Sequence, residues 1–76
     1  MNDRPQVLIT GAAGFAGSHL VEQLASHAEV TAWARSRPPE HVAHLARWTH
    51  VDLLDRERVR AEVRGLRPTV VYHCAG

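Results

Sequence analysis

The sequence is poor in the residues that crosslink small proteins through disulfides or metal ions, and in those that bind nucleic acids. It has one cysteine, Cys74, no lysine, and only two Trp, one Tyr and one Phe. A lone cysteine excludes an internal disulfide framework and a zinc site built mainly from thiolates, and it fits a reducing compartment. The apolar runs are short and residues 1–6 are polar, so the sequence predicts no signal peptide, transit peptide or membrane-spanning helix. We therefore expect a cytoplasmic protein without a membrane partner.

The charges of the chain are almost balanced. All nine basic residues are arginines, and eight acidic residues bring the formal net charge to +1. A nucleic-acid-binding surface needs an excess of positive charge and more aromatic residues, so we expect no nucleic-acid partner. Of the six histidines, His41 and His44 form only an i, i+3 pair beside prolines, and we expect no metal site. The 76 residues hold at most one domain.

Short apolar runs alternate with helical periodicities along the whole chain. Strands are expected at residues 6–10, 29–35, 48–51 and 69–74, and helices at residues 15–27, at 40–47 and from the N-cap Asp55 to Pro68. This alternation predicts an α/β fold of the Rossmann type, a doubly wound parallel sheet with helices on both faces. Right-handed crossovers give the strand order 3-2-1-4.

Each expected helix has an apolar face for the sheet. In the first helix this face comprises Phe15, Ala16, Leu20, Val21, Leu24 and Ala25, and Ser18 falls outside it. The short second helix is expected to turn inward Val42, Ala43, Leu45 and Ala46. In the third helix the apolar stripe comprises Val59, Val63 and Leu66.

A glycine-rich turn joins the first expected strand to the first expected helix. Residues 10–17 read T-G-A-A-G-F-A-G, which spaces Gly11, Gly14 and Gly17 three residues apart. Gly11 allows a sharp turn, Gly14 lets a ligand approach the backbone, and Gly17 permits close packing of the helix on the sheet. The N–H groups that begin the helix would face a pyrophosphate, so the pattern predicts a dinucleotide site. The alternative is a glycine-rich turn that binds nothing, and a P-loop is excluded because no Gly-Lys-Ser or Gly-Lys-Thr follows.

Three motifs in order resemble those of one enzyme family. They are T-G-A-A-G-F-A-G-S-H-L at residues 10–20, V-D-L-L-D at 51–55 and R-P-T-V-V-Y-H-C-A-G at 67–76. Together they resemble the opening of an extended short-chain dehydrogenase/reductase, within that superfamily the NAD(P)-dependent sugar-nucleotide epimerases, dehydratases and reductases. The resemblance implies that residues 1–76 are the N-terminal part of an NAD(P)-binding Rossmann domain.

The same resemblance implies that the catalytic residues lie outside this chain. The family's Ser/Thr, its Tyr-x-x-x-Lys pair and its substrate domain would all follow the third motif. Tyr72 is the sole tyrosine, and the chain has no lysine to lower its pKa. We therefore interpret Tyr72 as structural and expect no catalytic residue among the 76.

The end of the second expected strand bears on the choice of cofactor. An Asp or Glu about 20 residues beyond the glycines would bond a ribose 2′-OH, but Ala34 stands at that position and Arg35, Ser36 and Arg37 follow it. A guanidinium accepts a 2′-phosphate through charge-assisted hydrogen bonds, so we expect NADP, with NAD as the alternative. The arginines also resemble the GDP-mannose 4,6-dehydratase and GDP-6-deoxy-hexose reductase branches. The alternative is that Arg35 and Arg37 are merely exposed loop residues.

The remaining expected cofactor contacts follow the third and fourth strands. By resemblance, Asp52 accepts a hydrogen bond from the adenine amine and Leu53 packs on the ring, whereas the alternative for Asp52 is an ordinary strand-end cap. The backbone of the segment with Cys74 and Ala75 would line the ribose groove, and His73 would form a hydrogen bond between sheet and helix. The full expected cofactor set is Gly11, Gly14, Phe15, Ala16, Gly17, Arg35, Arg37, Asp52, Leu53, Cys74 and Ala75.

Two functions remain open on this evidence. The first is the cofactor-binding part of an NAD(P)-dependent sugar-nucleotide dehydratase, reductase or epimerase, and the alternative is a stand-alone nucleotide-binding or interaction module without catalysis. The strand between Thr69 and Cys74 would form an apolar sheet edge without charge or proline, which is a template for pairing. We expect the remainder of the enzyme or a second chain to cover this edge, and a homo-oligomer as the full enzyme.

Overall fold

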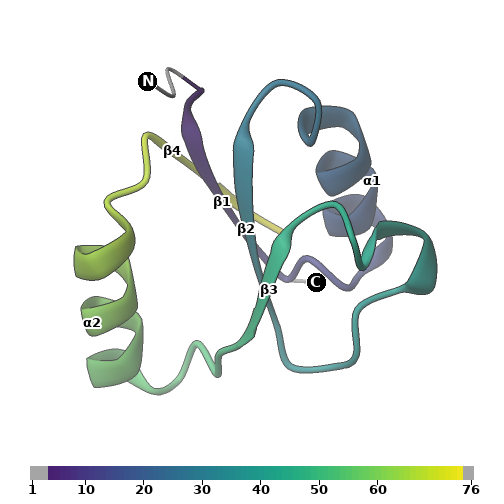
Figure 1. Ribbon diagram of the computed structural model, residues 1–76. Coiled ribbons are helices and arrows are strands. Elements are labelled where there is room, and N and C mark those ends of the chain that lie inside the picture. The colour runs from purple at the N-terminus through teal and green to yellow at the C-terminus, as the bar shows by residue number, and fades with distance from the viewer. Residues whose placement is uncertain (1–3, 75–76) are drawn as a thin grey trace.

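The computed structural model describes residues 4–74. In chain order the elements are β1 (Gln6–Thr10), α1 (Phe15–Leu24), β2 (Glu29–Ala34), the 3₁₀ helix η1 (Glu40–Val42), β3 (Arg47–His50), α2 (Arg56–Leu66) and β4 (Val70–His73) (Figure 1). The predicted alternation of strands and helices is confirmed, with η1 in place of the middle helix. No helix within residues 4–74 has the length and apolar character needed to cross a membrane.

The four strands form one parallel sheet in the order β3-β2-β1-β4, which confirms the predicted order. Figure 1 shows α1 and α2 on opposite sides of this sheet. The central strands β1 and β2 are buried along most of their length. Strands covered on both faces have near-continuous apolar sequences, which is why neither strand shows a clean alternation of apolar and polar residues.

Each face of the sheet has its own hydrophobic core. The larger core, on the α1 side, comprises Val7, Ile9, Ala12, Val21, Ala28, Val30, Ala32 and Val42. The smaller core comprises Leu8, Trp33 and Val51, against which Val59, Val63 and Leu66 of α2 pack. The apolar stripe predicted for the last helix is therefore confirmed.

The start of α1 differs from the predicted apolar face. Phe15 is 93% exposed and Ala16 is also exposed, whereas Gly17 and Ser18 are buried. The backbone of α1 approaches the glycine turn so closely that only small residues fit beneath it. The Ser18 hydroxyl donates to the Phe15 carbonyl oxygen at 3.1 Å, which satisfies this polar group inside the protein.

Two further helix predictions were too long. The first helix ends at Leu24 instead of residue 27, because the N–H groups of His27 and Ala28 both donate to the Leu24 carbonyl and turn the chain toward β2. The predicted helix at 40–47 shrinks to the three residues of η1, and Ala43 is exposed rather than inward. The Nε1–H of Trp48 donates to the Val42 carbonyl at 3.2 Å, so a side chain of β3 is bonded to the backbone of η1.

The strand bounds need smaller corrections. β2 ends at Ala34, one residue before the predicted end, and β3 occupies residues 47–50 rather than 48–51. β4 lies at an edge of the described sheet with Val70, Val71 and Tyr72 exposed by 39%, 51% and 37%. The apolar edge expected between Thr69 and Cys74 is therefore present in the structure.

Candidate functional site

Within residues 4–74, a cavity that we call the main cavity lies at the carboxyl ends of the parallel strands. Its volume is about 580 Å³. The lining residues come from four segments: 11 and 13–16 after β1, 33–36 at the end of β2, 51–54 after β3, and 74 after β4. Open α/β sheets bind ligands at this end, where the strand order reverses. In this sheet the reversal is at β1, whose neighbours are β2 and β4.

The glycine turn after β1 closes one side of the cavity. Gly11 has a φ of 64°, a left-handed conformation that favours glycine. The N–H of Gly14 donates to the Gly11 carbonyl at 3.2 Å, and the N–H of Ala12 donates to the Trp33 carbonyl of β2 at 3.0 Å. These bonds hold the turn against the sheet, and Gly14 then serves as the N-cap of α1.

The N-terminus of α1 opens toward this cavity. Gly14 has no side chain with which to cap the helix, and Phe15 and Ala16 of the first turn line the cavity. The first N–H groups of a helix have no partner within it, and the helix dipole adds partial positive charge there. The site can therefore accept an anion through backbone groups alone.

Gly14 and Gly17 serve different purposes in the structure. A Cβ atom at Gly14 would meet only the Gly11 carbonyl oxygen, at an ordinary contact distance of 3.5 Å, while the residue faces the cavity. A Cβ atom at Gly17 would lie 2.5 Å from the same oxygen and 2.6 Å from the Ala12 Cα. Gly17 is therefore needed for the packing of α1 against the turn and does not line the cavity. Gly14 does line the cavity, and its lack of a side chain leaves room beside the start of α1.

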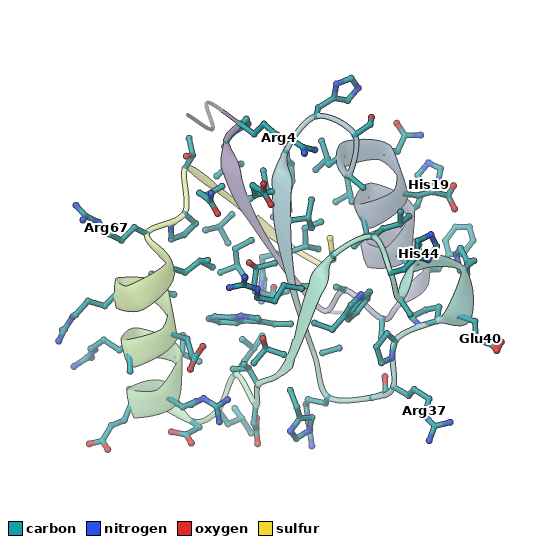
Figure 2. The ribbon with its side chains drawn as sticks, in the orientation of Figure 1. Arg4, His19, Arg37, Glu40, His44 and Arg67 are labelled. Atoms are coloured by element: carbon teal, nitrogen blue, oxygen red, sulfur yellow. The ribbon has the colours of Figure 1, made fainter. Side chains whose placement is uncertain are left out.

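The arginines after β2 are placed differently from each other. Arg35 is exposed and lines the cavity together with Ser36. Arg37 does not line it, and Figure 2 shows its side chain pointing outward from the loop before η1. Arg37 instead lines a neighbouring groove that also includes Arg35.

The segment after β3 combines a capping role with a place in the cavity wall. The Leu54 N–H donates to Oδ1 of Asp52 at 3.0 Å, so this carboxylate closes the turn that leads into α2. The alternative function of Asp52 as a strand-end cap is thus present in the geometry, and the residue also lines the cavity. Leu53 is half-buried against the Leu8 and Trp33 core and lines the same wall.

The segment after β4 supplies the last wall. Cys74 is half-buried, lines the cavity and donates its N–H to the Thr10 carbonyl at 3.0 Å. The expectation of a sheet-to-helix bond for His73 was wrong: its Nδ1 lies 2.6 Å from Oγ1 of Thr10, so the bond joins β4 to β1. The two residues are register partners in the sheet, which brings the side chains together. Ala75 lies outside the described residues.

Several cavity residues were not in the expected cofactor set, although the sequence had placed Ala34 at the position of the missing acid with Ser36 close behind it. They are Ala13, Trp33, Ala34, Ser36, Val51 and Leu54. Trp33 faces the Leu8 core and is only 2% exposed, yet it reaches the cavity because it pairs with Thr10 at the carboxyl end of β1. A rule that the last residues of neighbouring parallel strands converge would have identified Trp33, Ala34 and Val51.

Comparison with known proteins agrees with this architecture. A model of the NAD dependent epimerase/dehydratase family matches residues 7–76. The chain is 46% identical over 77 residues to a dTDP-4-dehydro-6-deoxy-D-allose reductase from a Streptomyces species, an alignment covering 91% of this chain and 24% of the relative. The chain thus spans about a quarter of the length of the curated relatives that it matches first.

Solved structures share the same arrangement of strands and helices. UDP-glucose 4-epimerase of Thermotoga maritima superposes with a TM-score of 0.82 at 30% identity, over 93% of this chain and 24% of that one. WbmH of Bordetella bronchiseptica, solved in complex with NAD+, superposes with a TM-score of 0.81 at 26% identity, over 96% and 26%. With the glycine turn, the sheet order and the family match in agreement, this chain belongs to the NAD-dependent epimerase/dehydratase family.

Proposed function

We propose that this chain forms the cofactor-binding part of an NAD(P)-dependent enzyme that acts on a sugar nucleotide, as a dehydratase, reductase or epimerase. The observation that carries the proposal is the cavity at the strand ends, where Gly14 leaves the wall bare beside the N-terminus of α1. Its volume of about 580 Å³ lies within the range of cofactor sites.

The residues around the cavity fit a dinucleotide in a defined orientation. The pyrophosphate would bind the N–H groups at Phe15 and Ala16, which begin α1 and line the cavity. Gly14 leaves room for it, because a Cβ at this position would occupy the space that the pyrophosphate needs. The adenosine would then lie between the ends of β2 and β3, near Asp52 and Leu53. This assignment leaves Gly17 as a packing residue and brings the backbone at Cys74 to the ribose groove.

We further propose NADP as the preferred cofactor. Ala34 occupies the position where a carboxylate would bond the 2′-OH, and Asp52 is the one acidic residue in the cavity lining. Arg35 lines the cavity beside this position, and no ion pair engages it within residues 4–74. A free guanidinium next to the ribose favours a phosphorylated ribose. NAD remains the competing cofactor in the experiments below.

The chemical step is assigned to residues outside this chain. The bound dinucleotide supplies the hydride chemistry, and residues 1–76 bind and orient it. Tyr72 lies in β4. In the family's catalytic pair a lysine stands four residues after the tyrosine, but the residue four positions after Tyr72 is Gly76. The proposal includes a cytoplasmic location, where the free Cys74 thiol stays reduced, and a homo-oligomeric enzyme.

The proposal is tested by replacing Gly14 with valine in the natural full-length polypeptide. A Cβ at this position meets the Gly11 carbonyl oxygen only at an ordinary contact distance, and the residue lines the cavity, so we expect NADPH affinity reduced at least about tenfold, the cost of one lost charge-assisted contact. Isothermal titration calorimetry measures this loss. Gly65→Val in α2 is the matched control, because a Cβ there meets nothing within 4 Å and the site lies outside the cavity. Equal NADPH affinity in the Gly14 variant and the parent would disprove the assignment.

A further inference from the structure

A second groove adjoins the cavity at the ends of β2 and β3. Its volume is about 460 Å³, and it shares Ala34, Arg35 and Ser36 with the main cavity. The residues that it adds include Arg37 and His50. We call this second space the basic groove, because every titratable residue that lines it is basic.

His50 enters the basic groove from a different strand than the arginines. It is the last residue of β3 and the register partner of Ala34, the residue at the position of the missing acid. The Val51 N–H donates to the Ala34 carbonyl at 3.3 Å and holds the two strand ends together. The groove thus combines guanidinium groups from the loop after β2 with an imidazole from β3.

No carboxylate in the described structure neutralises this cluster. The two ion pairs within residues 4–74 join His41 to Glu22 and Arg58 to Glu62, and neither involves Arg35 or Arg37. From α2, Arg58 donates to the His50 carbonyl at 3.4 Å, while its own charge is paired with Glu62. The nearest acid in sequence is Asp52, two residues beyond β3; it lines the main cavity and not the basic groove, and its Oδ1 accepts from the Leu54 N–H.

We propose that the basic groove receives the 2′-phosphate of the cofactor and that His50 is a specificity-determining residue for this phosphate. The inference rests on the proposed preference for NADP and extends it to a residue of β3. A phosphomonoester offers three acceptor oxygens, which two guanidinium groups and one imidazole N–H can bind from different sides. The arginines supply permanent charge, and the imidazole donates most strongly when it is protonated.

The test uses 2′,5′-ADP and 5′-AMP as probes, because they differ only in the 2′-phosphate. In the natural full-length polypeptide, His50→Gln is expected to raise the Kd for 2′,5′-ADP about three- to tenfold at about pH 6, the range for an exposed charge-assisted contact. The Kd for 5′-AMP should stay unchanged. His44→Gln is the matched control, since His44 is exposed and lines neither the cavity nor the basic groove.

Replacement by a permanently charged donor separates a phosphate contact from a structural role. A His50→Arg variant should keep the preference for 2′,5′-ADP over 5′-AMP, because a guanidinium donates charge-assisted hydrogen bonds to a phosphate.

The outcomes distinguish this inference from the proposed function. If the parent binds 2′,5′-ADP and 5′-AMP equally well, the NADP preference itself is wrong. If the parent prefers 2′,5′-ADP but His50→Gln has the same preference, the contact from His50 is overturned and the NADP proposal stands. A loss of affinity for both probes in His50→Gln, with no rescue by His50→Arg, also overturns it.

Discussion

Replacing Gly17 with alanine tests whether α1 packs against the backbone of the glycine turn so closely that no side chain fits at this position. The new Cβ would lie 2.5 Å from the Gly11 carbonyl oxygen and 2.6 Å from the Ala12 Cα. Carbon contacts are most favourable at about 3.5–4.0 Å, so the overlap is about 1 Å on backbone atoms that have no rotamer to escape into. Overpacking of this kind costs up to about 3 kcal/mol, and alanine gains about 1 kcal/mol over glycine in a helix. We expect a net loss of about 2 kcal/mol in the free energy of unfolding.

Urea unfolding followed by tryptophan fluorescence measures this loss, since Trp33 is buried and Trp48 is partly buried in the two cores. Gly14→Ala is the paired variant: its Cβ meets only an ordinary 3.5 Å contact, so it should lose less stability than Gly17→Ala, only the difference between glycine and alanine as an N-cap, while its NADPH affinity falls. The two glycines of one motif would then separate stability from binding. An unchanged midpoint in Gly17→Ala would refute the packing argument.

Three further predictions follow from the same structure. Arg35→Ala should weaken NADPH binding by about 1.5–3 kcal/mol and leave NADH nearly unchanged in calorimetry, with Arg60→Ala on α2 as control, and equal losses for both cofactors would reject the 2′-phosphate contact. Gly65→Ala should raise the free energy of unfolding by about 0.5–1 kcal/mol, because its Cβ enters open space in a helix, and a lower urea midpoint would contradict this. A polypeptide limited to residues 1–76 should self-associate in sedimentation velocity through the exposed apolar edge at β4, whereas a stable monomer that unfolds cooperatively would show that this edge needs no cover.

The order of strands and the glycine turn were predictable from the sequence because both depend on local patterns. Short apolar runs separated by helical periods leave few arrangements, and the right-handed crossover rule selects 3-2-1-4 among them. Gly11 follows the first strand directly, and its positive φ is the conformation that a sharp turn requires. The position of the cavity was predictable for the same reason, since parallel strands bring their carboxyl ends together.

Element ends and the facing of individual side chains required the tertiary structure. The sequence put Phe15 on the inner face of α1, but the close approach of Gly17 to the Gly11 carbonyl rotates the helix start so that Phe15 is exposed. The pairing of Thr10 with His73 depends on the register of β1 against β4, which joins residues far apart in the chain.

The separation of Arg35 from Arg37 was likewise decided only in three dimensions. Two residues apart in sequence, Arg35 lines both the cavity and the basic groove, whereas Arg37 lines only the basic groove of the two, where His50 of β3 joins them. The periodicity and composition of a sequence determine which elements form and in what order. The register between strands and the depth of helix packing depend on contacts across the sheet, and these determine which side chains share a site.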